Sequence, residues 1–439
     1  MIGIIRDIIF VIYIIYLLLT HHILSAKDIT VSQDMKPNTI TEAIQLAKNG
    51  DRIFVNKGYY AEGNIIIDKS IELTGNGYPE IDGKNQTEII TVRADNVKIK
   101  GFIIKNSGAS NLYDMAAIKT DNCKNCTIED NKLYDNFFAV YLSASSHSTV
   151  KNNFIQGHAL SESSSGNGIH LWKCHDILIE NNEISGHRDG IYFEFAIDSR
   201  ITGNTSKNNL RYGLHFMFSG GDVYENNTFT NNGAGVAVMY TKNVKMIGNT
   251  FQDNWGANAY GLLLKEIGNS MIYGNHFVKN TTGIYMESGT NLNIFENTFT
   301  SNGYAMKILG NCTDDSIIHN NFSSNTFDVS TNSSRSVNLF SENYWDKYNG
   351  YDMDRNGIGD VPYRPVSIFS IIVEDVPEAI FLLRSVIVNI MDIAEKVAPV
   401  FIPESLVDNK PLMKEYKPHP LILYKVVDQR GDELTRLNE

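Results

Sequence analysis

The sequence predicts an all-β chain that folds as a parallel β-helix, a solenoid with coils of about 22 residues. The first observation is a repeated motif of one apolar residue, two variable residues and an asparagine. The second is that each repeat holds two or three short β-like runs and almost no helix formers. The asparagines of the motif lie 22 to 29 residues apart and are Asn131, Asn153, Asn182, Asn204, Asn227, Asn249, Asn275, Asn297 and Asn321.

This period excludes several other repeat folds, and asparagine explains how the coils can turn. A spacing near 22 is too short for propeller blades or TPR helix pairs, and the repeats lack the LxxLxL pattern of leucine-rich repeats. Asparagine tolerates the left-handed backbone conformation of sharp corners, and stacked asparagines can hydrogen-bond along the solenoid. The longest spacing marks an insertion at residues 157–166, where we expect a loop beside the central coils.

Residues 1–26 have the pattern of a secretory signal peptide. An apolar run from Ile8 to Leu19 follows the basic residue Arg6, and Leu24-Ser25-Ala26 offers a cleavage site. Twelve apolar residues suit a secretory h-region but are too few to span a bilayer comfortably. An uncleaved membrane anchor is the alternative, and both interpretations predict export across the inner membrane.

The rest of the chain divides into three parts. Residues 27–342 are predicted to form the β-helix domain, including a short helix near residues 39–48 that covers the open edge of the first coil. Residues 343–367 form an acidic Asp/Gly loop, and residues 368–439 a helical, Pro-rich tail. Within the tail, we expect one helix over residues 377–396, which is too polar to span a membrane.

Charge and cysteine content narrow the function further. The formal net charge of −12 argues against nucleic acid as a partner. Cys123 and Cys126 form a CxxC motif, but the neighbouring sequence lacks a thioredoxin-like βαβ pattern. We therefore expect Cys126 to be a small core residue. Five histidines are individually expected to be solvated or to lie in turns, namely His170, His175, His187, His276 and His319.

Strand alternation in the central coils separates an inward set of residues from an outward set. The inward positions, such as Leu214 and Phe216, are all apolar and would fill the core. The outward positions include two histidines and two methionines, which is an unusual composition for a solvated wall. The outward residues are His170, Trp172, Tyr192, Glu194, His215, Met217, Ala237, Met239, Leu263, Lys265, Tyr285 and Glu287.

His215, Met217 and Met239 are candidate copper ligands. Met217 and Met239 are expected on adjacent rungs about 4.8 Å apart, with His215 diagonally within reach. Two thioethers and an imidazole form a soft ligand set that selects Cu(I) over Zn, Mg or Ca. Glu194, one rung away, is a further candidate ligand. Two other interpretations stay open on the residues alone: an apolar docking surface for a protein partner, and a carbohydrate groove.

The acidic loop contains a candidate calcium site. Asp352, Asp354, Asn356 and Asp360 supply alternating oxygen ligands around a glycine turn, and Ca²⁺ binds six to eight hard oxygens. Tyr363 stands where an EF-hand would have its bidentate Glu, so the loop is not an EF-hand. A metal-free Asx-turn is the alternative.

Several segments resemble the NosD family of periplasmic proteins that mature nitrous oxide reductase during denitrification. They are Arg188–Tyr192, Arg211–Phe218, Gly235–Tyr240, Gly261–Leu264, Asp352–Tyr363, Pro399–Pro403 and Val407–Met413. The resemblance implies a right-handed β-helix that is held at the inner membrane by the membrane and ATPase subunits of an ABC transporter. It also implies that copper is accepted from a copper-chaperone lipoprotein and supports assembly of the reductase's copper-sulfide cluster.

Under this resemblance the chain is a metallochaperone-like maturation factor and not an enzyme. His215, Met217 and Met239 would bind Cu(I) transiently, the cargo would be copper, sulfur or both, and the tail would dock on the membrane subunit. ATP hydrolysis would belong to a partner, because the chain has no G-x-x-x-x-G-K-[ST] motif. The rival function is a secreted polysaccharide lyase, hydrolase or epimerase. Glu194, Lys265 and Glu287, separated by methionines, form a poor constellation for such proton transfer.

Overall fold

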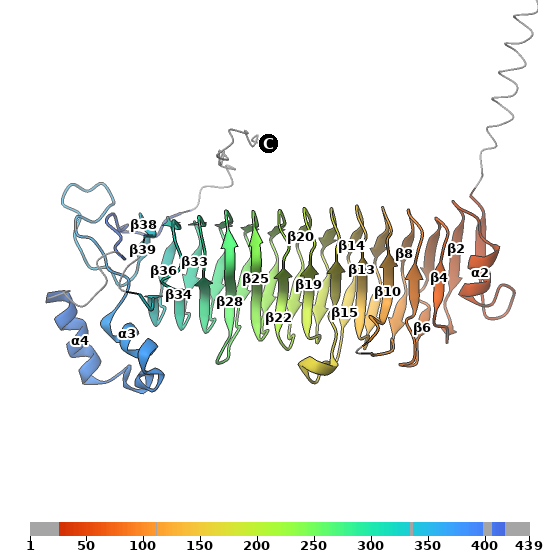
Figure 1. The fold of residues 1–439 in the computed structure, drawn as a ribbon, viewed down its shortest axis with the longest axis horizontal. Helices are drawn as coiled ribbons and strands as arrows, with labels where there is room; N and C mark the ends of the chain where they lie inside the picture. Colours follow the sequence, from red (N-terminus) through yellow and green to blue (C-terminus); the bar gives the residue numbers. More distant parts are fainter. Residues whose placement is uncertain (1–25, 111, 334–336, 398–405, 418–439) are drawn as a thin grey trace, which may run out of the picture.

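The protein is a long three-sided solenoid, described by a computed structural model (Figure 1). The structure describes residues 26–110, 112–333, 337–397 and 406–417. The predicted signal peptide lies outside these residues except for Ala26. Each coil adds one strand to each of three parallel sheets, so the predicted parallel β-helix is confirmed.

The first sheet has fourteen strands and runs from the N-terminal end of the solenoid to the last coil. Its three-residue strands each point one residue into the core, as Ile128, Val150 and Ile179 show. Its strands are β1 (Asp28–Val31), β2 (Arg52–Asn56), β5 (Glu72–Asn76), β8 (Lys98–Lys100), β11 (Thr127–Glu129), β14 (Thr149–Lys151), β17 (Leu178–Glu180), β20 (Arg200–Thr202), β23 (Val223–Glu225), β26 (Lys245–Ile247), β29 (Met271–Tyr273), β32 (Asn293–Phe295), β35 (Ser316–Ile318) and β38 (Leu339–Ser341).

The second sheet has thirteen strands and carries a continuous stack of aromatic rings in the core. From Phe251 to Phe322 the ring centroids are 4.7–4.8 Å apart, which is the spacing between rungs. Its strands are β3 (Tyr59–Tyr60), β6 (Glu80–Asp82), β9 (Ile103–Lys105), β12 (Lys132–Tyr134), β15 (Phe154–Gln156), β18 (Glu183–Ser185), β21 (Thr205–Lys207), β24 (Thr228–Thr230), β27 (Thr250–Gln252), β30 (His276–Val278), β33 (Thr298–Thr300), β36 (Asn321–Ser323) and β39 (Tyr344–Trp345).

The third sheet has twelve strands and carries the candidate site on its outer face. Its strands are β4 (Ile65–Ile67), β7 (Ile90–Val92), β10 (Ala116–Asp121), β13 (Phe138–Ser143), β16 (Ile169–Trp172), β19 (Asp189–Glu194), β22 (Tyr212–Met217), β25 (Ala234–Lys242), β28 (Tyr260–Gly268), β31 (Thr282–Glu287), β34 (Tyr304–Ile308) and β37 (Phe327–Ser330). The insertion predicted at residues 157–166 is a loop with one short 3-10 turn, η1 (Glu162–Ser164).

The predicted asparagine ladder is present along one corner of the solenoid. In a typical rung, Asn227 Oδ1 accepts hydrogen bonds from the backbone N–H of Asn204 at 2.9 Å and from its side-chain amide at 3.0 Å. The Asn204 amide also donates to the Ile179 carbonyl. Each side chain thus satisfies backbone groups that a strand-to-strand corner leaves unpaired.

The ladder departs from the prediction in one coil and has an unpredicted companion. It passes through Asn320 and not Asn321, because Ile317 and not Ile318 faces the core in β35. Asn321 begins β36 instead. A second buried ladder follows the next corner and comprises Asn209, Asn232, Asn254, Asn280, Asn302 and Asn325.

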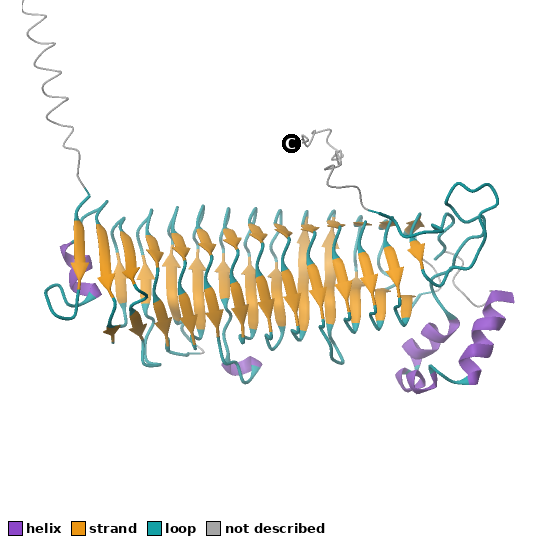
Figure 2. Ribbon diagram, turned by 180° about the vertical axis from the view of Figure 1, so that it is seen from behind, coloured by secondary structure: helices purple, strands orange, loops and turns teal. Residues whose placement is uncertain are grey.

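Helices lie at both ends of the solenoid (Figure 2). At the N-terminal end, α2 (Ile40–Leu46) is capped by the Thr39 side chain and buries Ile40, Ala43 and Ile44. At the C-terminal end are α3 (Ile368–Asp375), the 3-10 helix η2 (Pro377–Leu382) and α4 (Val386–Val397). A continuous helix over residues 377–396 was therefore a wrong prediction. Residues 377–382 adopt the tighter 3-10 form, and the Ser385 hydroxyl accepts a bond from Val388 N–H as α4 begins.

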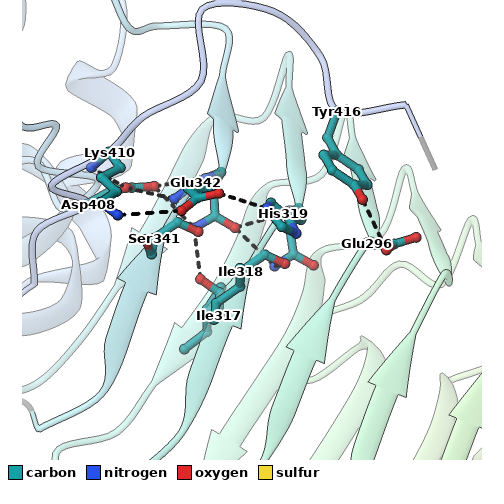
Figure 3. Close-up of polar contacts among 11 residues, drawn as sticks. Glu296, Ile317, Ile318, His319, Ser341, Glu342, Asp408, Lys410 and Tyr416 are labelled. Carbon is teal, nitrogen blue, oxygen red and sulfur yellow. Dashed lines mark hydrogen bonds and ion pairs between the residues drawn. The ribbon is translucent and has the colours of Figure 1, made fainter. Parts of the chain in front are cut away.

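A clasp formed by residues 406–417 covers the last coil (Figure 3). The buried carboxylate of Asp408 accepts hydrogen bonds from Asn343 N–H at 3.0 Å, the Asn343 amide at 3.1 Å and Trp345 Nε1 at 3.0 Å. Asp408 therefore occupies the next rung of the asparagine ladder. Further along, Tyr416 stacks on His319 with ring centroids 4.5 Å apart and donates a hydrogen bond to Glu296.

Candidate functional site

The central coils bring Met217 and Met239 onto adjacent rungs. Met217 of β22 pairs with Met239 of β25, and the same column continues to Glu194 on one side and Lys265 on the other. The alternating residues Leu214, Phe216, Val236 and Val238 are fully buried. The register predicted for the outward column is thus confirmed.

The two methionines are half-buried, and the neighbouring Lys265 forms an ion pair on the side away from Met217. Met217, Met239 and Glu194 all retain partial exposure, so an ion can reach them from solvent. Lys265 Nζ lies 3.3 Å from a Glu287 carboxylate oxygen, one coil beyond the methionine pair. This ion pair directs the lysine charge away from the Met217 side of the column.

His215 is buried, although its place in the outward set suggested an exposed side chain. Only 6% of its surface is exposed, and its ring lies against Tyr192 and Tyr212 with centroids 4.9 and 4.7 Å away. Its Nδ1 atom is 3.3 Å from Arg211 Nη2. Its Nε2 atom is buried and has no hydrogen-bond partner among the described residues. Burial lowers the pKa of His215, which favours the neutral imidazole that metals bind.

A buried aspartate holds this histidine in place. Asp189 is fully buried, and Arg211 donates to its two oxygens at 2.9 and 2.6 Å. Its Oδ2 atom is 4.0 Å from His215 Nδ1. Burial alone would raise the pKa of Asp189, but the neighbouring imidazole of His215 and the hydrogen-bonded Arg211 guanidinium lower it to about 2. A carboxylate behind an imidazole is the usual support for a metal-binding histidine.

The ring column extends from His215 towards the N-terminal coils, where two more histidines are buried. Tyr141, His170, Tyr192 and His215 have successive ring centroids 4.6–4.9 Å apart. Burial lowers the pKa of His170 to about 3. The expectation of a solvated or turn histidine was therefore wrong for His170, which is buried within β16. His187 is buried as well, but it lies in the bend between β18 and β19, so it is a turn histidine as expected.

An exposed aromatic ridge, consisting of Phe195, Phe218 and Tyr240, borders the methionines. These residues directly follow Glu194, Met217 and Met239 in the sequence, and their rings stack at 5.4 and 5.1 Å. They are 37–46% exposed, and each has a positive φ near 50–55°. Sequence reasoning missed this ridge. The available signal was an aromatic residue after the outward column in three consecutive coils.

The acidic loop closes on itself and on the clasp. Asp352 accepts hydrogen bonds from the N–H groups of Asn356 and Gly357, and Asp360 accepts one from Met353 N–H. Asp354 bonds the Asn356 amide. These are Asx-turn contacts, and calcium binding by the four residues stays a prediction. The loop also contacts the clasp, where Gly359 N–H donates to Pro411.

Two further features bear on the predictions, namely the state of the cysteines and the length and polarity of the helices. Cys123, Cys126, Cys174 and Cys312 are all buried with unpaired thiols. Within the described residues, no helix has the length and apolar character needed to cross a bilayer.

Comparison with known proteins identifies similar sequences over most of the chain. A family model described as "Periplasmic copper-binding protein (NosD)" matches residues 155–353, which include β22 and β25. The "Probable ABC transporter binding protein NosD" of Pseudomonas aeruginosa is 29% identical over 393 residues, covering 85% of this chain and 91% of that protein. The protein of the same name from Stutzerimonas stutzeri is 26% identical over 400 residues, covering 86% and 90%.

Solved structures share the fold with low sequence identity. The catalytic domain of a GH87 α-1,3-glucanase has a TM-score of 0.58 at 13% identity, covering 73% of this chain and 69% of that chain. A family 28 exopolygalacturonase from Yersinia enterocolitica has a TM-score of 0.53 at 10% identity, covering 72% and 78%. Such likenesses show the β-helix alone. By its family-model match over the central coils and its similarity to two relatives along most of their length, the chain is similar to the NosD proteins.

Proposed function

We propose that the chain is an exported copper-handling accessory protein that works with an ABC transporter. In this role it supplies copper, sulfur or both for assembly of the copper-sulfide cluster of nitrous oxide reductase. The observation that carries the proposal is the pairing of Met217 and Met239 on adjacent rungs beside a buried, neutral His215. The relatives' names and the family description support the transporter and the copper.

The chemistry of the site favours transient Cu(I) binding. Thioether sulfurs are soft ligands, and His215 Nε2, which has no hydrogen-bond partner among the described residues, could add a nitrogen ligand when its proton is displaced. Arg211, which is itself ion-paired with Asp189, would donate a hydrogen bond to His215 Nδ1 and so orient the ring. Glu194 is a harder ligand at the margin of the site. Because the methionines remain half-exposed, a bound ion could pass to and from another protein.

The aromatic ridge is the surface that we assign to the copper donor, a copper-chaperone lipoprotein. Left-handed backbone costs a side-chain-bearing residue about 1–2 kcal/mol, so bulky aromatic residues are unusual at these corners. Phe195, Phe218 and Tyr240 form an exposed apolar strip directly beside the methionines. Exposed aromatic strips of this kind mark interaction sites.

The C-terminal helices are the surface that we assign to the membrane subunit of the transporter. In α4, Val388 is buried against α3, whereas Ile387, Ile390 and Ile393 are about 60% exposed. Phe381 in η2 is 90% exposed. This apolar face has no cover among the described residues and therefore suits an apolar partner.

Anaerobic Cu(I) titration against a competing chelator tests the copper site. We expect the full chain to bind Cu(I), and the Met217→Ala/Met239→Ala variant to bind it more weakly. The loss should exceed the ~10–100-fold effect of removing a supporting outer-shell group. Met271→Ala is the matched control, because Met271 is a half-buried methionine on the fourteen-stranded sheet. Equal affinity in wild type and double variant would refute the copper site.

Co-purification with the transporter tests the tail. Ile390→Glu places a charge on the exposed face of α4 and should abolish recovery of the membrane subunit without lowering thermal stability. Ile66→Glu is the control, because Ile66 is also exposed but lies in β4 near the other end of the solenoid. Unchanged recovery with Ile390→Glu would show that this face is not the docking surface.

Carbohydrate processing has weaker support. A lyase or epimerase needs accessible groups that exchange protons with substrate. On the outer face of β16–β25, His170, His215 and Asp189 are buried, and Asp189 is ion-paired with Arg211. Accordingly we place the chain among accessory proteins and not among enzymes.

A further inference from the structure

A second cluster of metal-binding side chains lies at a corner of the solenoid, away from the methionines. His147 follows β13, and His175 and Asp176 follow β16, the next strand of the same sheet. Asp176 Oδ2 is 3.3 Å from His147 Nδ1 and 3.1 Å from His175 Nδ1. All three ligand atoms lie within 4.8 Å of one another. Among the described residues, this is the sole set of three such side chains.

The backbone fixes the three residues firmly. His147 N–H donates to the His175 carbonyl at 3.2 Å, and Asp176 N–H donates to the Ile197 carbonyl at 3.2 Å. His175 also pairs in parallel with Ser146 on one side and Ile197 on the other. The stacked corners therefore hold the ligands in position before any ion arrives, which reduces the entropic cost of binding.

The distances fit a tetrahedral ion. Metal–ligand bonds of 2.0–2.2 Å place neighbouring ligand atoms of a tetrahedron roughly 3.3–3.6 Å apart. The two nitrogen–oxygen separations, 3.3 and 3.1 Å, are close to that value. The three side chains are about half exposed, which leaves room for water in the fourth position.

We infer that His147, His175 and Asp176 bind a divalent transition metal that accepts tetrahedral geometry, such as Zn²⁺ or Co²⁺. Imidazole and carboxylate ligands suit these borderline ions, whereas Cu(I) prefers thioethers and thiolates. The ion links the corners of two neighbouring coils. This site is independent of the methionine pair, which lies on strands further towards the C-terminus. The chain thus carries two metal sites of different softness.

Zn²⁺ titration by calorimetry tests this inference on the full chain. We expect His147→Asn and Asp176→Asn each to remove one equivalent of bound Zn²⁺. Asparagine suits both positions, because both residues have a positive φ near 50° that asparagine tolerates. His276→Gln is the control, because His276 is exposed on β30 and outside the cluster. The Met217→Ala/Met239→Ala variant should retain the full Zn²⁺ stoichiometry.

Two results would overturn the inference. One is equal Zn²⁺ uptake by wild type, His147→Asn and Asp176→Asn. The other is an equal loss in His276→Gln, which would indicate nonspecific binding by surface histidines. A second measurement needs no substitution: Co²⁺ bound to the wild-type chain should show the intense d–d absorption of a four-coordinate ion, and one equivalent of Zn²⁺ should abolish it. Absence of that absorption would also count against the site.

Discussion

At the residue scale, several buried polar groups occupy positions where the solenoid normally has asparagine or serine. Asp222 Oδ1 accepts a hydrogen bond from Ser199 N–H at 2.9 Å, in the place where Ser270 serves Val244 two coils later. Asp222 Oδ2 has no hydrogen-bond partner among the described residues. Burial raises the pKa of Asp222 to about 8. The carboxyl group therefore stays protonated in the folded protein at neutral pH.

This protonation predicts that stability falls as pH rises. The unfolded Asp222 loses its proton near pH 4, whereas the folded one keeps it to about pH 8. The contribution of the protonated Asp222 to the free energy of unfolding is fully present below about pH 4. It is lost as pH rises from there through about 8, at ~1.4 kcal/mol per pH unit. Asp222→Asn should remove this slope. Urea unfolding at several pH values measures this slope, with the exposed and distant Asp34→Asn as control. Identical slopes in wild type and Asp222→Asn would contradict the prediction.

How much of the site the sequence predicts depends on the range of the contacts involved. The pairing of Met217 with Met239 follows from glycine spacing and strand alternation, which are local. The burial of His215 does not follow from them, because it depends on Arg211, Tyr192 and Asp189 packing around the ring. Alternation assigns a side chain to a face, but the neighbours on that face decide whether water reaches it.

At the element scale, the strands of the twelve-stranded sheet from β10 to β31 each have a left-handed residue at or just before the corner that follows. Different coils fill this position differently: Lys173 and Ser288 are polar, whereas Phe195, Phe218 and Tyr240 are aromatic. The aromatic coils are those that carry Glu194, Met217 and Met239. The corner conformation alone needs no aromatic ring, and we assign these rings to partner binding.

Replacement of the central ring tests this separation of stability from function. In Phe218→Asn, asparagine tolerates the left-handed backbone better, which stabilises the fold by about 1 kcal/mol. Loss of the ring stack destabilises it by about the same amount, so the two effects offset each other. We expect the free energy of unfolding to change by no more than ~1 kcal/mol, while copper transfer from a loaded donor slows. By contrast, Phe216→Ala in the core should cost about 3–5 kcal/mol. Urea unfolding and a transfer assay measure both; a large stability loss in Phe218→Asn would show that the ridge is structural.

The elements themselves were largely predictable, with errors where the repeat changes. Regular coils repeat the same apolar and asparagine positions, so the alignment of one coil on its neighbour also gives the alignment of the others. In the coil containing Ile317 and Ile318, two isoleucines and the pair Asn320–Asn321 make two registers equally plausible from sequence. The structure selects Ile317 and Asn320, because they align with Ile294 and Asn297 of the preceding coil.

At the scale of the whole molecule, the clasp completes a solenoid that would otherwise end in open strand edges. Asp408 cannot be identified from the repeat, because it lies 65 residues beyond Asn343 in the sequence. It nevertheless serves as the last acceptor of the asparagine ladder. As a carboxylate it accepts hydrogen bonds without donating any, so the ladder terminates there.

Asp408→Ala should therefore destabilise the C-terminal coils. The change leaves the Asn343 N–H and Trp345 Nε1–H donors unsatisfied in a buried position. Each unsatisfied buried donor lowers the free energy of unfolding by about 1–3 kcal/mol. Urea unfolding should show this loss, and sedimentation should show association through the uncovered edge. Glu415→Ala, an exposed change in the same segment, is the control. Equal stability of the two variants would show that the clasp is dispensable.

The stack of coils also sets a distance. Five rungs separate β22 from β37, the last strand of the twelve-stranded sheet, which corresponds to about 24 Å at ~4.8 Å per rung. Since every rung is hydrogen-bonded to the next, we expect the coils to move together as one rigid body. If the solenoid tilts about the C-terminal helices, Met217 and Met239 therefore move along an arc. Deletion or insertion of one whole coil between the methionines and these helices would change the distance that separates them by one rung.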